Sequence, residues 1–307
     1  MVSTLAAQIN YNPLTGVYQG LLIDRATFTT VGIKITNRCN LDCYHCARYG
    51  GEDFPYENAT MVLDRLANGN VARINFTGGE PLIFNGLENV LRYASRLVLP
   101  SRKKFSLSIT TNGVKLDQDK AQMLSEYLDS IKISLFALGS NYGVVTGNNY
   151  GAYDSAIAGI RNAISAGLPV HAQTGVLKEN HDYLVQMASL LDGLGVAKFT
   201  IYSNIEQAKG RTLPVAKRFL EEELRRAFDK LLEEKHKRSW NLKIDWRKWP
   251  LEGQYILIFS NGDITANPVD NPPQNFEHVG NLLEETVETL WQRYPNKQSH
   301  ISFYLNR

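Results

Sequence analysis

The chain has 307 residues, 43% hydrophobic and 21% charged, which is ordinary for a globular protein of one large α/β domain or two small ones. Its net charge is +2 without a long basic stripe, no apolar run reaches the roughly 20 residues of a membrane helix, and residues 1–16 lack a secretory signal pattern. Three cysteines cannot form a disulfide scaffold. We therefore expect a reduced, cytoplasmic, soluble protein that binds neither nucleic acid nor membrane.

Short β-branched runs alternate with helical patterns from residue 31 to about 210. The sequence predicts strands at 31–37, 71–79, 104–113, 130–137, 169–177 and 197–204. Apolar spacing predicts helices at 61–69, 87–98, 119–129, 152–167 and 182–195. Because these connections are too long for hairpins, we expect a parallel sheet, open or curled into a barrel. Its reactive groups should gather at the C-terminal ends of the strands.

The pattern changes after residue 210. A long amphipathic helix is predicted at 214–238, a hairpin at 255–267 around Asn261-Gly262, and a last helix at 282–294. The segment 240–250 holds three of the four tryptophans. We favour a hydrophobic anchor there, with a ligand-gripping surface as the alternative.

All three cysteines lie on one loop, directly after the first predicted strand. Cys39, Cys43 and Cys46 have the spacing C-x3-C-x2-C. A structural zinc site needs a fourth ligand, and His45, adjacent to Cys46, would point poorly into the same tetrahedron. Three thiolates can instead hold three irons of a [4Fe–4S] cluster and leave the fourth iron open to a small molecule. The spacing favours the cluster, with zinc as the alternative.

A second motif, FTGGEP, closes the second predicted strand at residues 76–81. Alone, Gly78-Gly79 would indicate only a tight turn, although glycines also let backbone approach a ligand closely. In series with the cysteine motif, it makes residues 30 to 210 resemble the radical S-adenosylmethionine (radical SAM) superfamily. The resemblance implies a partial (β/α)6 TIM-like barrel, one [4Fe–4S] cluster on the three cysteines, and S-adenosylmethionine (SAM) as the second cofactor.

The same resemblance suggests which residues contact SAM. It implies that Glu80 receives the amino group of SAM and that Ser134 faces its ribose or carboxylate. His45 stands against the adenine, or is a loop histidine without a role. The full set of SAM-binding candidates is His45, Thr77, Gly78, Gly79, Glu80, Pro81, Thr111, Asn112, Ser134, Val176 and Tyr202.

The resemblance also implies a reaction. An external one-electron reductant, such as flavodoxin or ferredoxin, supplies an electron, and SAM is cleaved to methionine and a 5′-deoxyadenosyl radical that abstracts a hydrogen atom from the substrate. Expected outcomes are rearrangement, elimination, decarboxylation or epimerisation. Candidate hydrogen donors to the product radical are Tyr142, Tyr150, Tyr153 and Tyr202, although each of the 15 tyrosines is more often structural.

The C-terminal region resembles the SPASM or twitch extension of some members. Asn267 stands where that extension carries a cysteine, and no cysteine lies outside the first motif. We therefore expect an N-terminal extension over 1–30, the barrel over 31–210, and over 211–307 a hairpin-plus-helix cap without an auxiliary cluster.

Two enzyme classes and one binding class remain open for the substrate. A small molecule, such as a sugar, a nucleoside or an amino-acid-derived metabolite in natural-product biosynthesis, fits a chain with little beyond a barrel and a short cap. Peptide maturation is the alternative. About 30 residues precede the first strand, too few for a winged-helix leader-binding domain, although a separate protein could supply one. A zinc-stabilised binding protein would leave the GGEP motif unexplained.

Overall fold

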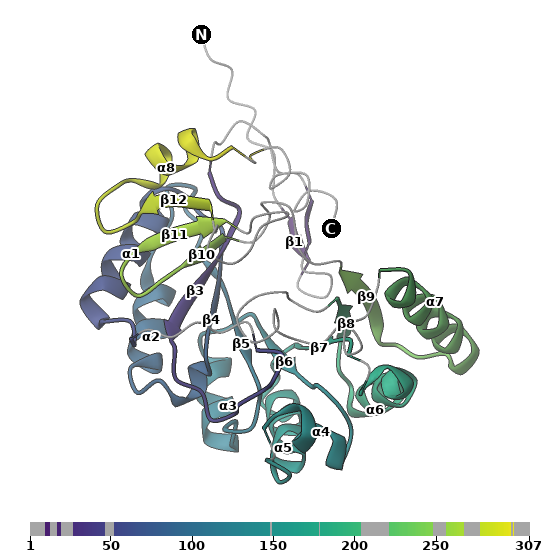
Figure 1. Cartoon of the computed structure of the whole chain (residues 1–307). Helices are drawn as coiled ribbons and strands as arrows, with labels where there is room; N and C mark the ends of the chain where they lie inside the picture. The colour runs from purple at the N-terminus through teal and green to yellow at the C-terminus, as the bar shows by residue number, and fades with distance from the viewer. Residues whose placement is uncertain are drawn as a thin grey trace.

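A computed structural model gives the fold, shown in Figure 1. The structure describes residues 10–12, 17–19, 27–46, 52–147, 149–177, 179–203, 221–247, 256–266, 277–295 and 297. In chain order the elements are β1 Asn10–Asn12, β2 Val17–Gln19, β3 Thr30–Thr36, α1 Tyr56–Asn68, β4 Arg73–Gly78, η1 Pro81–Ile83, α2 Leu87–Arg96, β5 Ser106–Thr111, α3 Gln118–Ser125, β6 Ser130–Ser134, α4 Ser140–Val145, α5 Ala152–Ser165, β7 Val170–Gly175, η2 His181–Tyr183, α6 Leu184–Leu194, β8 Lys198–Tyr202, α7 Glu221–Arg238, β9 Lys243–Arg247, β10 Ile256–Ile258, β11 Asp263–Ala266, β12 Glu277–Asn281 and α8 Val287–Arg293.

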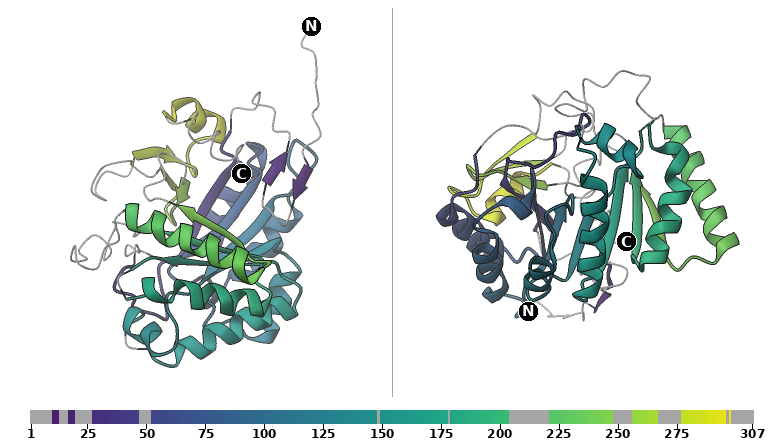
Figure 2. Two further views of the ribbon diagram at one scale, coloured as in Figure 1. Left: turned by 90° about the vertical axis from the view of Figure 1, so that its right-hand side faces the viewer. Right: turned by 90° about the horizontal axis from the view of Figure 1, so that it is seen from below.

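Ten strands form one open sheet in the order β12-β11-β10-β3-β4-β5-β6-β7-β8-β9. Strands β3 to β9 are parallel in sequence order, and helices cover one face in an outer arc (Figures 1 and 2). This parallel, helix-covered arrangement follows from crossover connections that pack back onto the strands they join. It confirms the predicted α/β partial barrel.

Alternation along the strands separates the apolar core from the concave face of the sheet. On β4, Ile74 and Phe76 are fully buried beneath the helices, whereas Asn75 points to the other side. Helix α2 meets this core through Leu87, Val90, Leu91 and Ala94, spaced at the helical period. The concave face therefore carries the polar side chains of these strands.

Several short features of the structure lie outside the sequence prediction, among them the 3-10 helix η1. The others include the β1–β2 hairpin, the short helix α4, and the strands β9 and β12, and their patterns are too short to stand out in the sequence. Strand β9 lies inside the tryptophan-rich segment. Trp246 faces α7, where its ring lies 6.1 Å from the ring of Phe228 between centroids, so this part of the segment acts as a hydrophobic anchor.

The C-terminal hairpin, predicted as part of a cap, continues the main sheet. Strand β10 pairs in parallel with β3, and β11 and β12 follow antiparallel. Helix α8 packs near the start of β3, where the ring centroids of Trp291 and Phe28 are 5.1 Å apart. Since reactive groups sit at the opposite, C-terminal ends of the strands, α8 does not cover the predicted site.

The predicted domain boundaries stay predictions. The boundary at residue 210 falls in 204–220, outside the described residues, and so does Asn267. Strand β9, beyond that boundary, still pairs with β8 in the main sheet. Within the described part of the chain, no helix has the length and apolar character needed to cross a membrane.

Candidate functional site

The cysteine loop leaves the C-terminal end of β3 and is held by α4. Cys46 closes a turn by donating its N–H to the carbonyl of Cys43 at 3.2 Å. Two further backbone N–H groups, those of Asp42 and Tyr44, donate to the last carbonyls of the α4 region at 3.3 Å each. Carbonyls at a helix end lack helical partners, so α4 provides ready acceptors for the loop.

The three cysteines form no disulfide with one another and are half-buried, which suits an iron–sulfur cluster. Burial raises the pKa of the Cys43 thiol, and the neighbouring Cys46 and Cys39 raise it further. Three thiolates on this loop therefore need positive charge between them, which iron supplies. Among the described residues no three His, Cys, Asp or Glu side chains are grouped to hold a single metal ion. In a cluster each thiolate meets its own iron, so the ligands stand farther apart than around one zinc.

The GGEP turn lies against the base of the cysteine loop. The N–H of Gly79 donates to the carbonyl of Thr36 at 2.7 Å, and the N–H of Glu80 donates to the carbonyl of Arg38 at 2.7 Å. A side chain at Gly79 would place its Cβ 2.0 Å from the Arg38 carbonyl oxygen, and one at Gly78 would be 2.2 Å from that of Thr36. The glycines thus allow close contact with the loop backbone, a reason distinct from the ligand approach expected from the sequence.

Glu80 is almost fully buried and joins the GGEP turn to the end of β5. Its Oε1 accepts the N–H of Leu82 at 3.0 Å and the hydroxyl of Thr111 at 2.6 Å, and its Oε2 accepts the N–H of Asn112 at 2.7 Å. Burial raises the pKa of this carboxyl, against the lowering effect of the three hydrogen bonds. A carboxylate offers about four acceptor sites, so one remains for a further donor.

Asn112 completes the connection back to the cysteines. Its Nδ2 donates to the side-chain oxygen of Asn40 at 2.9 Å and lies 3.9 Å from the sulfur of Cys39. Two of the predicted site residues, Thr111 and Asn112, therefore order the glutamate and the cysteine loop.

His45, next to Cys46 in the chain, makes an aromatic contact. Its ring lies 4.6 Å from that of Phe136 between centroids, at the C-terminal end of β6. Burial lowers the pKa of His45 to about 4, so the imidazole is neutral at physiological pH. Its Nδ1 is buried and makes no hydrogen bond to the described residues. This neutral ring with a spare nitrogen suits contact with a base or another flat polar group.

Two residues that the sequence did not single out, Asn180 and Glu179, hold the neighbouring strand ends. The Asn180 side chain accepts the N–H of Leu177 at 2.8 Å and donates to the carbonyls of Phe136 and Gly175 at 2.8 Å each. Glu179 accepts the hydroxyl of Tyr44 at 2.8 Å. Their only signal in the sequence is their position just after Val176, one of the SAM-binding candidates.

The other residues predicted to contact SAM lie along the C-terminal ends of the strands. Ser134 ends β6 and accepts a hydrogen bond from Gln173 at 3.2 Å. Val176 is buried and donates its N–H to the carbonyl of Tyr202 at 2.9 Å. Thr77 precedes the glycines on β4, and Pro81 is buried at the start of η1.

The four candidate tyrosines separate by environment. Tyr142 on α4 is fully buried, its hydroxyl makes no hydrogen bond to the described residues, and burial raises its pKa with further effects from Cys43 and Glu80. Tyr202 lies on the concave side of β8, beside Gly175. Tyr153 on α5 packs near Tyr142, with ring centroids 6.1 Å apart, whereas Tyr150 is 57% exposed. Of the four, Tyr142 is close to the cysteine loop and Tyr150 faces solvent.

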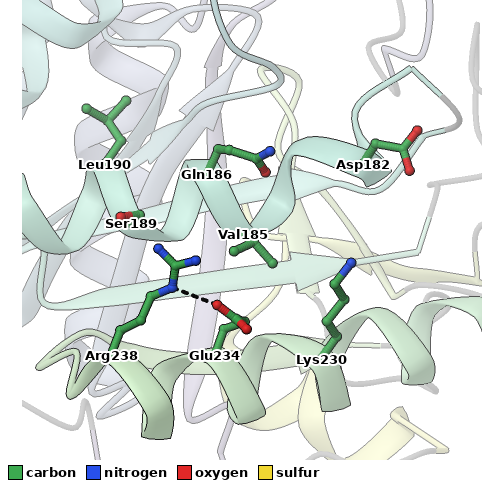
Figure 3. Close-up of a pocket in the computed structure, with 8 residues that line it drawn as sticks. All are labelled: Asp182, Val185, Gln186, Ser189, Leu190, Lys230, Glu234 and Arg238. Atoms are coloured by element: carbon green, nitrogen blue, oxygen red, sulfur yellow. Dashed lines mark hydrogen bonds and ion pairs between the residues drawn. The ribbon is translucent and has the colours of Figure 1, made fainter.

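A separate groove of about 520 Å³ lies between α6 and α7 (Figure 3). Lys230, Glu234 and Arg238 line it from α7, and the Arg238 Nε bonds Glu234 at 2.6 Å. Because both helices cover the outer face of the sheet, this groove is on the opposite side from the concave face.

Comparison with known proteins identifies the family that the cysteine and GGEP motifs resemble. The sequence model of the radical SAM superfamily matches residues 33–191. A probable GTP 3′,8-cyclase of Methanosarcina acetivorans is 33% identical over 165 residues, which are 50% of this chain and 47% of that protein. The pre-heme d1 synthase of Dinoroseobacter shibae is 29% identical over 183 residues, 58% of this chain and 44% of that protein. The chain thus spans about half the length of the curated relatives it matches.

Solved structures show the same fold at low identity. The crystal structure of Streptococcus suis SuiB bound to S-adenosylmethionine superposes with a TM-score of 0.73 at 18% identity, covering 91% of this chain and 68% of that one. SuiB bound to its precursor peptide SuiA gives 0.71 at 17% identity, covering 91% and 67%. At this identity the likeness establishes the fold.

Proposed function

The chain belongs to the radical SAM superfamily and is an enzyme, and from this premise we propose that Cys39, Cys43 and Cys46 hold one [4Fe–4S] cluster used to cleave SAM. The observation that carries the proposal is the continuous hydrogen-bonded path from the cysteine loop through Asn112 to Glu80 and the GGEP turn. That path fixes the cluster loop and the SAM surface relative to each other.

The bound cluster and SAM would supply a 5′-deoxyadenosyl radical, and the protein must position the atoms around it. The free acceptor site of Glu80 is suited to the ammonium of SAM. Ser134 offers a hydroxyl to its ribose or carboxylate, and His45 with Phe136 offers a flat, neutral surface to the adenine. The remaining SAM contacts would come from Thr77, Pro81, Val176 and Tyr202.

We place the substrate among small molecules of natural-product biosynthesis. The curated relatives are named for small-molecule chemistry, a GTP cyclase and a haem-precursor synthase. Peptide maturation is the second candidate, since SuiB, a structural neighbour, is bound to a precursor peptide. The sequence relatives carry more weight, because their identity is higher than the 17% shared with SuiB.

The remaining chemistry needs a reductant and a means of quenching the product radical. An external flavodoxin or ferredoxin in a reducing cytoplasm would supply the electron. Tyr142 is the tyrosine best placed to donate a hydrogen atom, because it is buried beside the cysteine loop. The C-terminal region would carry no second cysteine-ligated cluster, because the chain has only three cysteines.

Iron analysis after anaerobic reconstitution tests the cluster assignment. About four irons and four sulfides per chain are expected for one cluster, and each Cys→Ala variant should lose them. About eight irons, or tightly bound zinc, would contradict it. Stimulation of SAM cleavage by nucleotides or sugars, compared with short peptides, separates the two substrate classes.

A further inference from the structure

The concave face of the sheet is polar and basic, whereas the helix-covered face is apolar. On β6 and β8, Ile133 and Ile201 are fully buried in the helix-covered core. Because successive side chains of a strand point to opposite faces, Lys132 and Lys198 belong to the concave face. Figure 2 shows that the helices stand on the other side of these strands.

Basic residues form a row across four neighbouring strands of this face. The register pairs Lys132 of β6 with His171 of β7, His171 with Lys198 of β8, and Lys198 with Lys243 of β9. Paired residues of adjacent strands share a face, with the strands about 4.8 Å apart. We call Lys132, His171, Lys198 and Lys243 the basic row.

Two arginines add to the positive charge around the basic row. Arg73 of β4 and Arg247 of β9 lie on the same face as their register partners Ser106 and Tyr202. Burial, together with the nearby charges of Arg247, Lys198 and Arg73, lowers the pKa of Lys132 to about 7. Cations therefore converge on Lys132 from several strands.

The described strands β3 to β9 contribute a single carboxylate next to the basic row. It belongs to Asp245, which lies 2.9 Å from the Lys198 Nζ and 3.7 Å from the Arg247 Nε. Positive charges held together in a partly buried space repel one another and lose hydration, which costs free energy unless a negative group binds there. Within the described part of the chain Lys132 and Lys243 make no ion pair, so the basic row keeps positive charge that an anionic ligand would offset.

Two features of this face bear on ligand binding, namely the hydrogen bonds that hold Lys132 and the state of His171. The Asn75 side-chain oxygen accepts from Lys132 at 3.3 Å, from Ser108 at 3.0 Å and from Thr110 at 3.1 Å, which fixes the lysine amine. The Nε2 of His171 is buried and makes no hydrogen bond to the described residues. A lysine held in place beside an unused ring nitrogen is suited to an oxyanion.

We propose that the basic row binds an anionic group, a phosphate or a carboxylate, of the small-molecule substrate. The inference rests on the proposed function for the position of the reacting carbon. Ser134, at the SAM edge, follows Lys132 by two residues, which is about 6–7 Å along a strand. The substrate's anion would thus sit about that far below the hydrogen that is abstracted.

Isothermal titration calorimetry on the reconstituted protein with SAM tests this site. The probes are inorganic pyrophosphate, the tricarboxylate tricarballylate, and glycerol as a neutral control. At least one of the two anions should bind, and glycerol should not. Higher affinity for pyrophosphate would indicate a phosphorylated substrate, and higher affinity for tricarballylate would indicate a carboxylated one. Lys132→Gln should raise the Kd of the more tightly bound anion about ten- to hundredfold.

The matched control is Lys237→Gln, the same charge change on a side chain that is 75% exposed on α7. Anion affinity should be unchanged in this variant. If Lys132→Gln fails to fold by circular dichroism, Arg73→Gln takes its place with the same expected loss. The proposal is overturned if neither anion binds the wild type. It is also overturned if Lys132→Gln, or Arg73→Gln in its place, binds anions as tightly as Lys237→Gln does.

Separate readouts keep this inference distinct from the proposed function. Wild-type protein that cleaves SAM but binds neither anion would refute only the anion site. Wild-type protein that binds anions through Lys132 but neither holds iron nor cleaves SAM would refute the proposed function and leave an anion site on the sheet.

Discussion

Glu80→Gln probes the residue on which the cysteine loop, the GGEP turn and β5 converge. The change removes one charge and turns one acceptor oxygen into an NH2 donor. The fixed N–H groups of Leu82 and Asn112 point at different oxygens of Glu80. Whichever way the new amide lies, one N–H therefore faces a donor, while the Thr111 hydroxyl can rotate. In this buried position the lost hydrogen bond should lower the free energy of unfolding by about 1–3 kcal/mol.

The same variant should bind SAM more weakly. Losing a charge-assisted hydrogen bond to the ammonium costs about 1.5–3 kcal/mol, which corresponds to about a ten- to hundredfold rise in Kd. Urea denaturation and calorimetric SAM titration of the reconstituted protein measure the two effects, with iron content as a separate check. Glu88→Gln on α2, where Glu88 pairs with Arg92 at the surface, is the control and should change neither. Unchanged SAM affinity in an iron-loaded Glu80→Gln protein would refute the assignment of Glu80.

Three further predictions follow from the described contacts. Gly79→Ala should reduce iron loading, because its Cβ would lie 2.0 Å from the Arg38 carbonyl, whereas Gly193→Ala on α6, with open space around it, should not; equal iron in both would contradict the close approach. Asn180→Ala should lower the free energy of unfolding by on the order of 3 kcal/mol in urea, since it removes one hydrogen-bond partner from each of three buried backbone groups, of which the Gly175 carbonyl keeps the Thr174 hydroxyl; a loss below about 0.5 kcal/mol would contradict this role. The pKa of Lys132, lowered to about 7, lies below that of an unfolded lysine, so the unfolded chain binds more protons above pH 7 and stability should rise with pH. Relative to Lys132→Met, wild-type stability in urea should gain up to about 1.4 kcal/mol per pH unit between about pH 7.5 and about pH 9, and a constant difference would show that the lysine is not perturbed.

The sequence was sufficient to predict the parallel strands and the resemblance to the radical SAM superfamily, because both depend on local patterns. The strand predicted at 31–37 is β3 over Thr30–Thr36, and the loop that follows carries all three cysteines. The hairpin predicted at 255–267 is present as β10 and β11, but its parallel pairing with β3 depends on residues more than 200 positions away, which no local pattern reveals.

The arrangement within the site needed the structure. The family resemblance implies that Gly78 and Gly79 contact SAM, which stays a prediction, and the structure adds that Gly79 lies against the loop backbone at Arg38. The basic row is also invisible in sequence, because Lys132, His171, Lys198 and Lys243 are scattered along the chain and meet only through strand register. Asn180 could not be recognised from the sequence, apart from its position shortly after Val176. A buried asparagine resembles any loop residue in sequence until its hydrogen-bond partners are known.

Formation of 5′-deoxyadenosine tests the central claim most directly. Anaerobically reconstituted wild-type protein is given dithionite and SAM, and the products are measured by liquid chromatography with mass spectrometry. We predict 5′-deoxyadenosine and methionine from the wild type and neither product from Cys43→Ala, whose thiol lies on the loop between Cys39 and Cys46. Wild-type protein that carries a full cluster yet forms no 5′-deoxyadenosine, or Cys43→Ala protein that forms as much as the wild type, would contradict the account.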